Sequence, residues 1–161
     1  MQARTLRWTG VCALALVVAV AAFGPEQAAV ADQHGQVAEE RSKLMKGMGG
    51  AMRTLKGFVE GRNSAEEASA AADVIAAAAP KIPDVFPPGT GMGADPKSES
   101  KDVIWEKWDE FTAASALLGD KAAALKTALA SGDASAAGAA FGDLGKNGCG
   151  GCHRQFREKR N

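Results

Sequence analysis

Two cysteines and a histidine stand close together near the C-terminus, in the order Cys149-Gly150-Gly151-Cys152-His153. On a helix, residues three and four positions apart share one face, so the two thiols and the imidazole would lie side by side. This spacing is the attachment signature of c-type haem, in which each thiol forms a thioether with a porphyrin vinyl group and the imidazole binds the iron. The stretch therefore predicts covalent haem binding.

Other uses of these side chains fit the sequence less well. A zinc site needs four ligands, and the other histidine, His34, is far away in the sequence. A thioredoxin-like redox motif belongs near a βαβ pattern, and the sequence shows no strand alternation. A simple disulfide would leave His153 unexplained. Haem accounts for all three side chains together.

The first 31 residues have the three parts of a secretory signal peptide. Arg4 and Arg7 form a positive start, an apolar run follows, and the small residues Ala29-Val30-Ala31 form a cleavage site. The alternative is a retained membrane anchor, but that needs roughly 20 apolar residues and this run has about 15. We therefore expect export to the periplasm without a stable membrane anchor, and a mature chain that begins near Asp32.

The mature chain, residues 32–161, is expected to be one domain of about 130 residues. It keeps two cysteines, because Cys12 leaves with the leader, so both thiols are committed to the haem motif and no disulfide framework remains. Leader removal takes two of 19 basic and one of 19 acidic side chains, which leaves a net charge of −1. A near-neutral chain has no basic excess for binding nucleic acid or anionic lipid.

Composition and periodicity predict an all-α protein. Alanine is abundant and tyrosine is absent. Apolar residues alternate by four and three over residues 36–60 and 100–130, which is the spacing of a bundle seam. A capping box at Ser64-Ala65-Glu66-Glu67 begins another helix, which stops at Pro80. Asp133 can cap a fourth helix that runs to about Lys159.

Four such helices predict an antiparallel bundle with one long crossover, residues 80–99, between the second and third helices. Connections of this length in a small domain tend to be functional or to wrap around something. Glycines oppose helix formation in the first helix (47, 49 and 50) and in the fourth (145, 148, 150 and 151). We expect them to make room for a flat macrocycle between these helices; the alternative is that the helices kink or fray there.

Together these features resemble the class II c-type cytochromes, the family of cytochrome c′ and its low-spin relatives. The resemblance rests on residues 41–46 and 86–91, on Ile104-Trp105, on the haem motif and on Phe156-Arg157. It implies a four-helix bundle with one haem c per chain. In that bundle Cys149 and Cys152 would be the thioether cysteines and His153 the proximal iron ligand.

The resemblance also implies roles for Arg41, Met45 and Arg157. Arg41 matches an arginine near a haem propionate; a cation on an apolar seam needs a partner in any case, unless it lies at the solvent end of the bundle. Arg157 matches an arginine beside the proximal face, or is an ordinary basic residue of a last helical turn. Met45 matches the distal position, so we expect it to face His153 across the cavity, with Met48 rotated further away. Its sulfur either binds the iron or only fills space.

The favoured function is non-enzymatic one-electron transfer with redox partner proteins of the periplasm. The alternative is a module that binds NO or CO at a five-coordinate haem. An enzyme ranks last, because a distal acid–base group would be needed and the mature chain has no second usable histidine. The resemblance is compatible with a monomer and with a homodimer.

Overall fold

The computed structural model describes residues 25–95 and 98–159. The signal-peptide prediction up to residue 24 lies outside the described residues. The helices are α1 (Pro25–Val59), α2 (Ala65–Ala78), α3 (Val103–Glu106), α4 (Trp108–Ala130), α5 (Ala134–Asp143) and α6 (Gly150–Phe156). Two 3-10 turns, η1 (Ala79–Lys81) and η2 (Pro83–Val85), follow α2, and a π-helix, η3 (Leu144–Cys149), joins α5 to α6.

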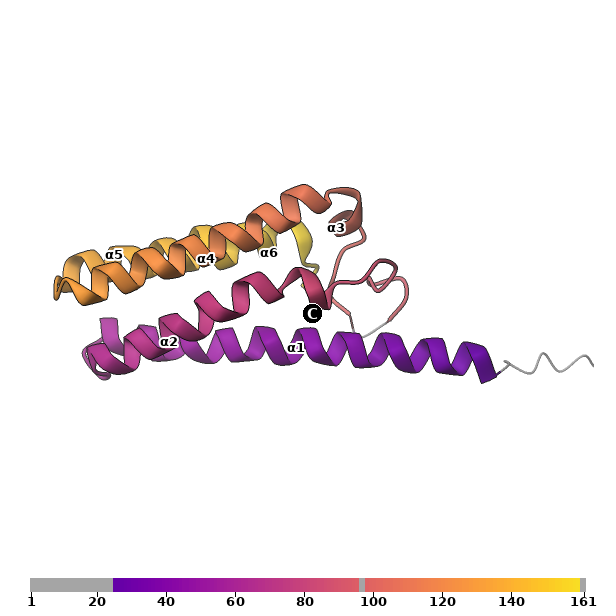
Figure 1. Ribbon diagram of the computed structural model, residues 1–161, viewed down its shortest axis with the longest axis horizontal. Helices are drawn as coiled ribbons and strands as arrows, with labels where there is room; N and C mark the ends of the chain where they lie inside the picture. Colours follow the sequence, from indigo (N-terminus) through magenta and orange to yellow (C-terminus); the bar gives the residue numbers. More distant parts are fainter. Residues whose placement is uncertain (1–24, 96–97, 160–161) are drawn as a thin grey trace, which may run out of the picture.

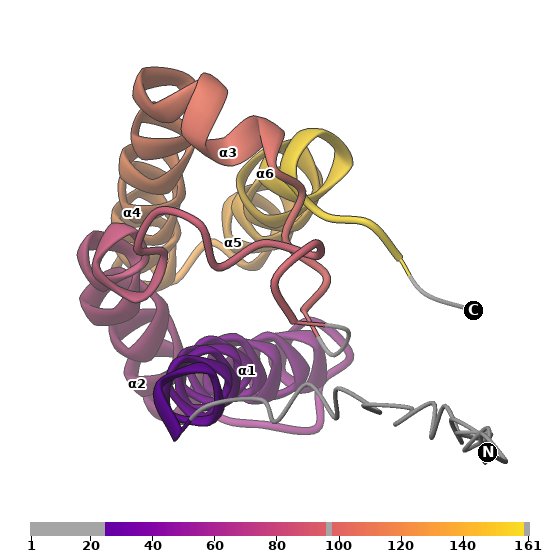
Figure 2. The ribbon, with the colours of Figure 1, turned by 90° about the vertical axis from the view of Figure 1, so that its right-hand side faces the viewer.

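The helices form an antiparallel bundle, as the sequence predicted (Figure 1). Helices α1 and α2 make one layer, and α4 with α5 and α6 makes the other; Figure 2 shows the bundle from its end. The long crossover between α2 and α3 lies at the same end of the bundle as α6. The crossover and the haem motif, which are far apart in the sequence, are therefore neighbours in space.

Two helix starts follow from local hydrogen bonds that the sequence predicted. The Ser64 hydroxyl accepts a hydrogen bond from the Glu67 N–H at 3.1 Å, and the Glu67 carboxylate accepts one from the Ser64 N–H at 2.8 Å. The Asp133 carboxylate accepts hydrogen bonds from the N–H groups of Ser135 and Ala136 at 2.8 and 3.0 Å. Because the first N–H groups of a helix have no partner within it, these bonds fix where α2 and α5 begin.

The apolar seams meet in one core. The largest of its fully buried side chains are Leu55, Ile75, Ile104, Phe111, Leu125 and Leu144. Near the crossover, the Phe111 ring lies 4.8 Å from the ring of Phe86 and 5.3 Å from that of Phe156, centroid to centroid. This aromatic cluster joins α4, the crossover and α6 at one end of the bundle.

Two of the predicted helices differ in extent from the prediction. Helix α1 begins at Pro25 rather than near residue 36, because residues 26–34 include several good helix formers although they carry no apolar seam. The helix expected over 100–130 is divided at Lys107, where the backbone has φ −123° and ψ 46°. Helix α3 is turned toward the crossover, where the Trp105 indole N–H donates to the Phe86 carbonyl at 3.0 Å. No helix among the described residues is long and apolar enough to cross a membrane.

The fourth predicted helix is not a continuous α-helix. It widens into η3 directly before the haem motif, where the Gly150 N–H donates to the Gly145 carbonyl, five residues back. It ends at Phe156 rather than near Lys159, because the following backbone bonds to the crossover: the Glu158 N–H donates to the Glu99 carbonyl at 2.8 Å. Within the described chain the pairing closest to a β-structure is an isolated bridge between Ser100 and Arg157.

Candidate haem-binding site

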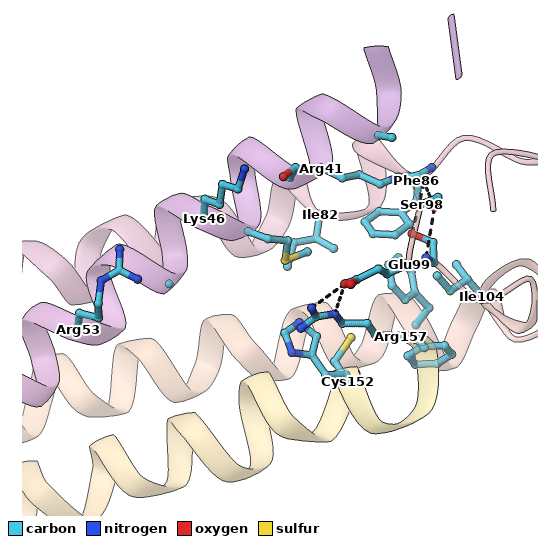
Figure 3. Close-up of a pocket in the computed structure, with 18 residues that line it drawn as sticks. Arg41, Lys46, Arg53, Ile82, Phe86, Ser98, Glu99, Ile104, Cys152 and Arg157 are labelled. Carbon is cyan, nitrogen blue, oxygen red and sulfur yellow. Dashed lines mark hydrogen bonds and ion pairs between the residues drawn. The ribbon is translucent and has the colours of Figure 1, made fainter. Parts of the chain in front are cut away.

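A cavity of about 690 Å³ lies between α1 and α6, at the crossover end of the bundle. Its volume falls within the roughly 300–1,000 Å³ that small-molecule and cofactor sites occupy. Residues from α1, the crossover, α4 and α6 form its walls (Figure 3). The apolar part of the wall consists of Ala38, Met45, Ile82, Phe86, Ile104, Phe111 and Phe156.

The haem motif lies at one wall of this cavity. Cys152 and His153, both in α6, line it, and Cys149 packs half-buried against the core one turn earlier. Both cysteines are free thiols. Among residues 25–95 and 98–159, no group of three or more His, Cys, Asp or Glu side chains is placed to hold a metal ion. The described residues therefore bring no further zinc ligand to these cysteines.

Burial shifts the pKa values of the two cysteines and the histidine of the motif toward their uncharged forms. It raises the pKa of the Cys149 thiol, and it raises the pKa of Cys152 to about 11, with Cys149 adding to the effect. Burial lowers the pKa of His153; the positive charge of Arg157 lowers it further and Glu99 opposes this. At neutral pH the imidazole is therefore uncharged, which is the form whose ring nitrogen can bind a metal.

Met45 lies on the α1 wall of the same cavity, opposite the α6 wall that carries His153. Met48 is different: it is 7% exposed, belongs to the core and does not line the cavity. The structure thus places a thioether from α1 and an imidazole from α6 on the walls of one cavity, and Met48 outside it. A bond from the Met45 sulfur to iron stays a prediction.

Arg41 is the best-connected cation of the site. It is only 5% exposed, so the alternative of an arginine at the solvent end of the bundle is wrong. Its Nε donates to the Val85 carbonyl at 2.5 Å, its Nη1 donates to the Thr90 carbonyl at 2.7 Å, and its Nη2 donates to the Thr90 hydroxyl. The guanidinium carbon lies 4.4 Å from the centre of the Phe86 ring. Arg41 therefore fastens the crossover to α1, and its pairing with a propionate stays a prediction.

Burial lowers the pKa of Arg41 to about 10, and the negative charge of Asp95 opposes the shift. The guanidinium consequently stays charged at neutral pH. A buried charge is stable only when its hydrogen bonds are satisfied, and here the crossover supplies the acceptors.

Arg157 lines the cavity next to His153 and pairs with an acidic residue that the sequence analysis missed. Its Nε and Nη2 both lie 2.6 Å from Oε2 of Glu99, which also lines the cavity (Figure 3). The Lys101 N–H donates to the Phe156 carbonyl at 3.0 Å, so the backbone joins the same two segments. No local pattern marks Glu99, because only the pairing of segments 58 residues apart brings it here.

The glycines of the first and fourth helices differ in what surrounds them. Gly49 lines the cavity, and a Cβ added there would meet nothing within 4 Å, which fits the expectation of bare backbone beside a macrocycle. In the fourth helix, a Cβ at Gly148 would lie 3.1 Å from Cδ1 of Leu118, and one at Gly150 would lie 3.2 Å from the Gly145 carbonyl oxygen. These two glycines allow close packing within the protein itself.

The donor set and the shape of the cavity fit a haem. The α6 wall offers the Cys152 thiol and a neutral imidazole, and the α1 wall offers the sulfur of Met45. The Cys149 thiol lies one turn before Cys152, at the sequence spacing of thioether attachment. Aliphatic and aromatic side chains form the apolar surfaces between them. The wall carries a net positive charge that suits a cofactor with two carboxylates, because Glu99 is the one acidic residue among its described residues, beside the cations Arg41, Lys46, Arg53 and Arg157.

Comparison with known proteins agrees with this geometry. The family model described as Cytochrome C' matches residues 36–157. Cytochrome c' of Pararhodospirillum photometricum is 40% identical over 121 residues, which cover 74% of this chain and 94% of that protein. Cytochrome c-556 of Agrobacterium tumefaciens (strain II Chrys) is 36% identical over 124 residues, which cover 76% of this chain and 97% of that protein.

Among solved structures, the crystal structure of cytochrome c' from Thermochromatium tepidum superposes with a TM-score of 0.67 at 32% identity. The match covers 76% of this chain and 95% of that one. The residues that the family model matches include the haem motif. The chain therefore belongs to the cytochrome c′ family of haem c proteins.

Proposed function

We propose that this protein is a one-electron carrier that holds a single haem c through Cys149 and Cys152. The observation that carries the proposal is one cavity with His153 on its α6 wall and Met45 on its α1 wall. When bound, haem supplies an iron that gains and loses one electron without making or breaking other bonds. The proposal assigns no catalysed reaction to the chain.

Each part of the site has a task in this proposal. The two thiols fix the cofactor to α6, and the neutral imidazole of His153 holds the iron from the same helix. Phe86, Phe111 and the other apolar wall residues keep bulk water away, and this burial tunes the reduction potential. The charges of Arg41 and Arg157 offset the two haem carboxylates.

Met45 decides how the iron is used. A methionine sulfur opposite a histidine raises the reduction potential and leaves no position for an external ligand, which suits electron transfer. If the sulfur only fills space, the distal side is open to a small diatomic such as NO or CO. This second function has support from a cytochrome c' structure, 31% identical with a TM-score of 0.69, whose description reports ligand-controlled dimer dissociation. In that case a ligand would control the dissociation of a homodimer here as well.

The test is the ferric absorption and EPR spectrum of the haem-loaded protein and of Met45→Ala. Electron transfer predicts a low-spin ferric spectrum that becomes high-spin in Met45→Ala, together with a gain in CO binding. Met48→Ala is the matched control, because Met48 belongs to the core and should leave the spin state unchanged. If the wild-type spectrum is high-spin and Met45→Ala does not alter it, the electron-carrier function is contradicted and the gas-binding function is favoured.

We also propose that residues 1–31 direct export to the periplasm and that the electron partners are proteins there. Support comes from the leader pattern and from the commitment of both mature cysteines to the haem motif. N-terminal sequencing of the secreted protein should find a start near Asp32. A protein that keeps its leader and stays in the cytoplasm would contradict export.

A further inference from the structure

The π-helix η3 ends at the first cysteine of the haem motif, and the proposed function gives it no role. In η3 the Gly150 N–H donates to the Gly145 carbonyl, five residues back, where an α-helix would use the carbonyl of Lys146, four back. The Arg154 guanidinium donates to that Lys146 carbonyl at 3.3 Å. The Lys146 carbonyl that an α-helix would give to Gly150 thus accepts from a side chain instead.

The buried residues of the fourth helix are one residue further apart in the sequence than a continuous α-helix would allow if both face the core. Leu144 and Phe156 are both buried, at 0% and 3% exposure. They are twelve positions apart in the sequence. At about 100° per residue, Phe156 would face about 120° away from Leu144. If one residue is absorbed in a wide turn, this difference falls to about 20°.

The wide turn also changes the direction in which the haem motif faces. Cys152 is eight positions after Leu144 in the sequence. In a continuous α-helix it would face about 80° away from Leu144, and with one residue absorbed it faces within about 20° of it. His153 follows Cys152 directly and lines the cavity with it.

We propose that η3 absorbs one extra residue of the fourth helix and thereby turns Cys152 and His153 to the cavity wall. The inference rests on the proposed haem attachment at these residues. Without the wide turn, α6 would be rotated by about 100° relative to α5. Phe156 would then leave the aromatic cluster, and the two haem-binding side chains would leave the wall that they now line. η3 is therefore a positioning element for haem attachment.

The test is a pair of single-residue deletions in the full-length, haem-loaded protein. Asn147 is exposed and lies within η3; its side chain bonds only to the exposed Asp143, at 2.6 Å. Deleting it should turn η3 into regular α-helix and keep the buried face continuous. We expect covalent haem loading, the ferrous spectrum and the melting temperature to match those of the full chain.

The matched control is deletion of Ala139, which is also exposed but lies in α5, outside the wide turn. This deletion should rotate Phe141 and Leu144 by about 100° away from the core. We expect a lower melting temperature and a loss of haem-loaded protein. An ordinary helix would be damaged equally by either deletion, so the difference between the two variants is the result that supports the proposal.

A further variant tests the wide turn itself. Gly150→Ala should lower the melting temperature of the full chain, because its Cβ would lie 3.2 Å from the Gly145 carbonyl oxygen. In the chain that lacks Asn147 the same substitution should lower the melting temperature by less, since the wide turn is gone. Gly142→Ala is the control, because it lies in α5, outside the haem motif, and a Cβ there would meet nothing within 4 Å.

The proposal is overturned if both deletions lose haem or if both are tolerated equally. It is also overturned if the chain without Asn147 fails to fold. A full chain without covalent haem would refute the proposed function separately. The two deletions would then still be compared by helical circular dichroism and melting temperature. The chain without Ala139 should again be less helical and less stable than the chain without Asn147.

Discussion

Replacing Arg41 with methionine is expected to release the crossover from α1 while the helices stay folded. Methionine keeps much of the length and apolar stem of arginine but removes every donor. The carbonyls of Val85 and Thr90 then lose their partner, and Phe86 loses the cation above its ring. The crossover forms part of the cavity wall, so its release would also open the site to water.

The size of the effect follows from two opposing contributions. All hydrogen bonds of Arg41 are lost. The three shortest, two to carbonyls and one to the Thr90 hydroxyl, each contribute about 1.5–3 kcal/mol because the donor is charged. The longer bonds from Nη1 to the hydroxyls of Ser98 and Ser100, at 3.5 and 3.3 Å, add little to this sum. Against this, burial lowers the pKa of Arg41 to about 10, which corresponds to about 3 kcal/mol against the charged form. The net loss in free energy of unfolding is therefore about 2–6 kcal/mol.

Guanidinium unfolding of the haem-loaded protein measures this loss, and limited proteolysis measures cleavage within residues 86–100. Arg53→Met is the control: Arg53 also lies on the α1 wall of the cavity but is exposed, so its replacement should change stability by less than about 0.5 kcal/mol. Arg41→Lys keeps the charge but not the forked donors, so its loss in free energy of unfolding should lie between those of Arg41→Met and Arg53→Met. If Arg41→Met is no more harmful than Arg53→Met and the crossover is cut no faster, Arg41 does not hold the crossover.

Three further predictions test other parts of the structure. Gly91→Ala should lower the melting temperature by an amount equivalent to about 1–3 kcal/mol, because a Cβ there would collide with the Asp102 carboxylate and lie 2.8 Å from the Trp105 ring; unchanged melting would contradict the close approach. Ser64→Ala should cost about 0.5–2 kcal/mol in chemical unfolding and leave the haem spectrum unaltered, since it removes only the α2 cap. His153→Ala should abolish the native ferrous spectrum while covalent attachment is at least partly kept, and a spectrum that does not change would remove His153 from the iron.

The parts of the fold that could be predicted depend on residues that are close in the sequence. The caps of Ser64 and Asp133 act over three residues, and both helices begin where these residues predicted. The buried seam of α4 repeats every three or four residues, so its inward face was visible in the sequence. The haem motif is equally local, which is why haem attachment could be predicted from the sequence alone.

The parts that could not be predicted depend on contacts between distant segments. The partners of Arg41 lie 44 to 59 residues further along the chain, and Glu99 meets Arg157 across 58 residues. Helical periodicity carries no information about such pairs. The break at Lys107 has the same origin, because the crossover draws Trp105 toward it.

The wide turn η3 is a different case, because its signal was present in the sequence. The inward positions of the fourth helix, Leu144, Gly148, Cys152 and Phe156, are spaced by four three times in succession, whereas a regular seam alternates four and three. One surplus residue in such a series is what a π-helical turn accommodates.

The central claim is that haem is attached covalently through Cys149 and Cys152, and its most direct test is the mass of the denatured protein. The chain should be purified from cells that mature c-type haem and measured intact under denaturing conditions. The account predicts the mass of the mature chain plus one haem, and the mass of the chain alone for the double variant Cys149→Ser/Cys152→Ser. A wild-type chain that loses its haem on denaturation, or a double variant that keeps it, would contradict the claim.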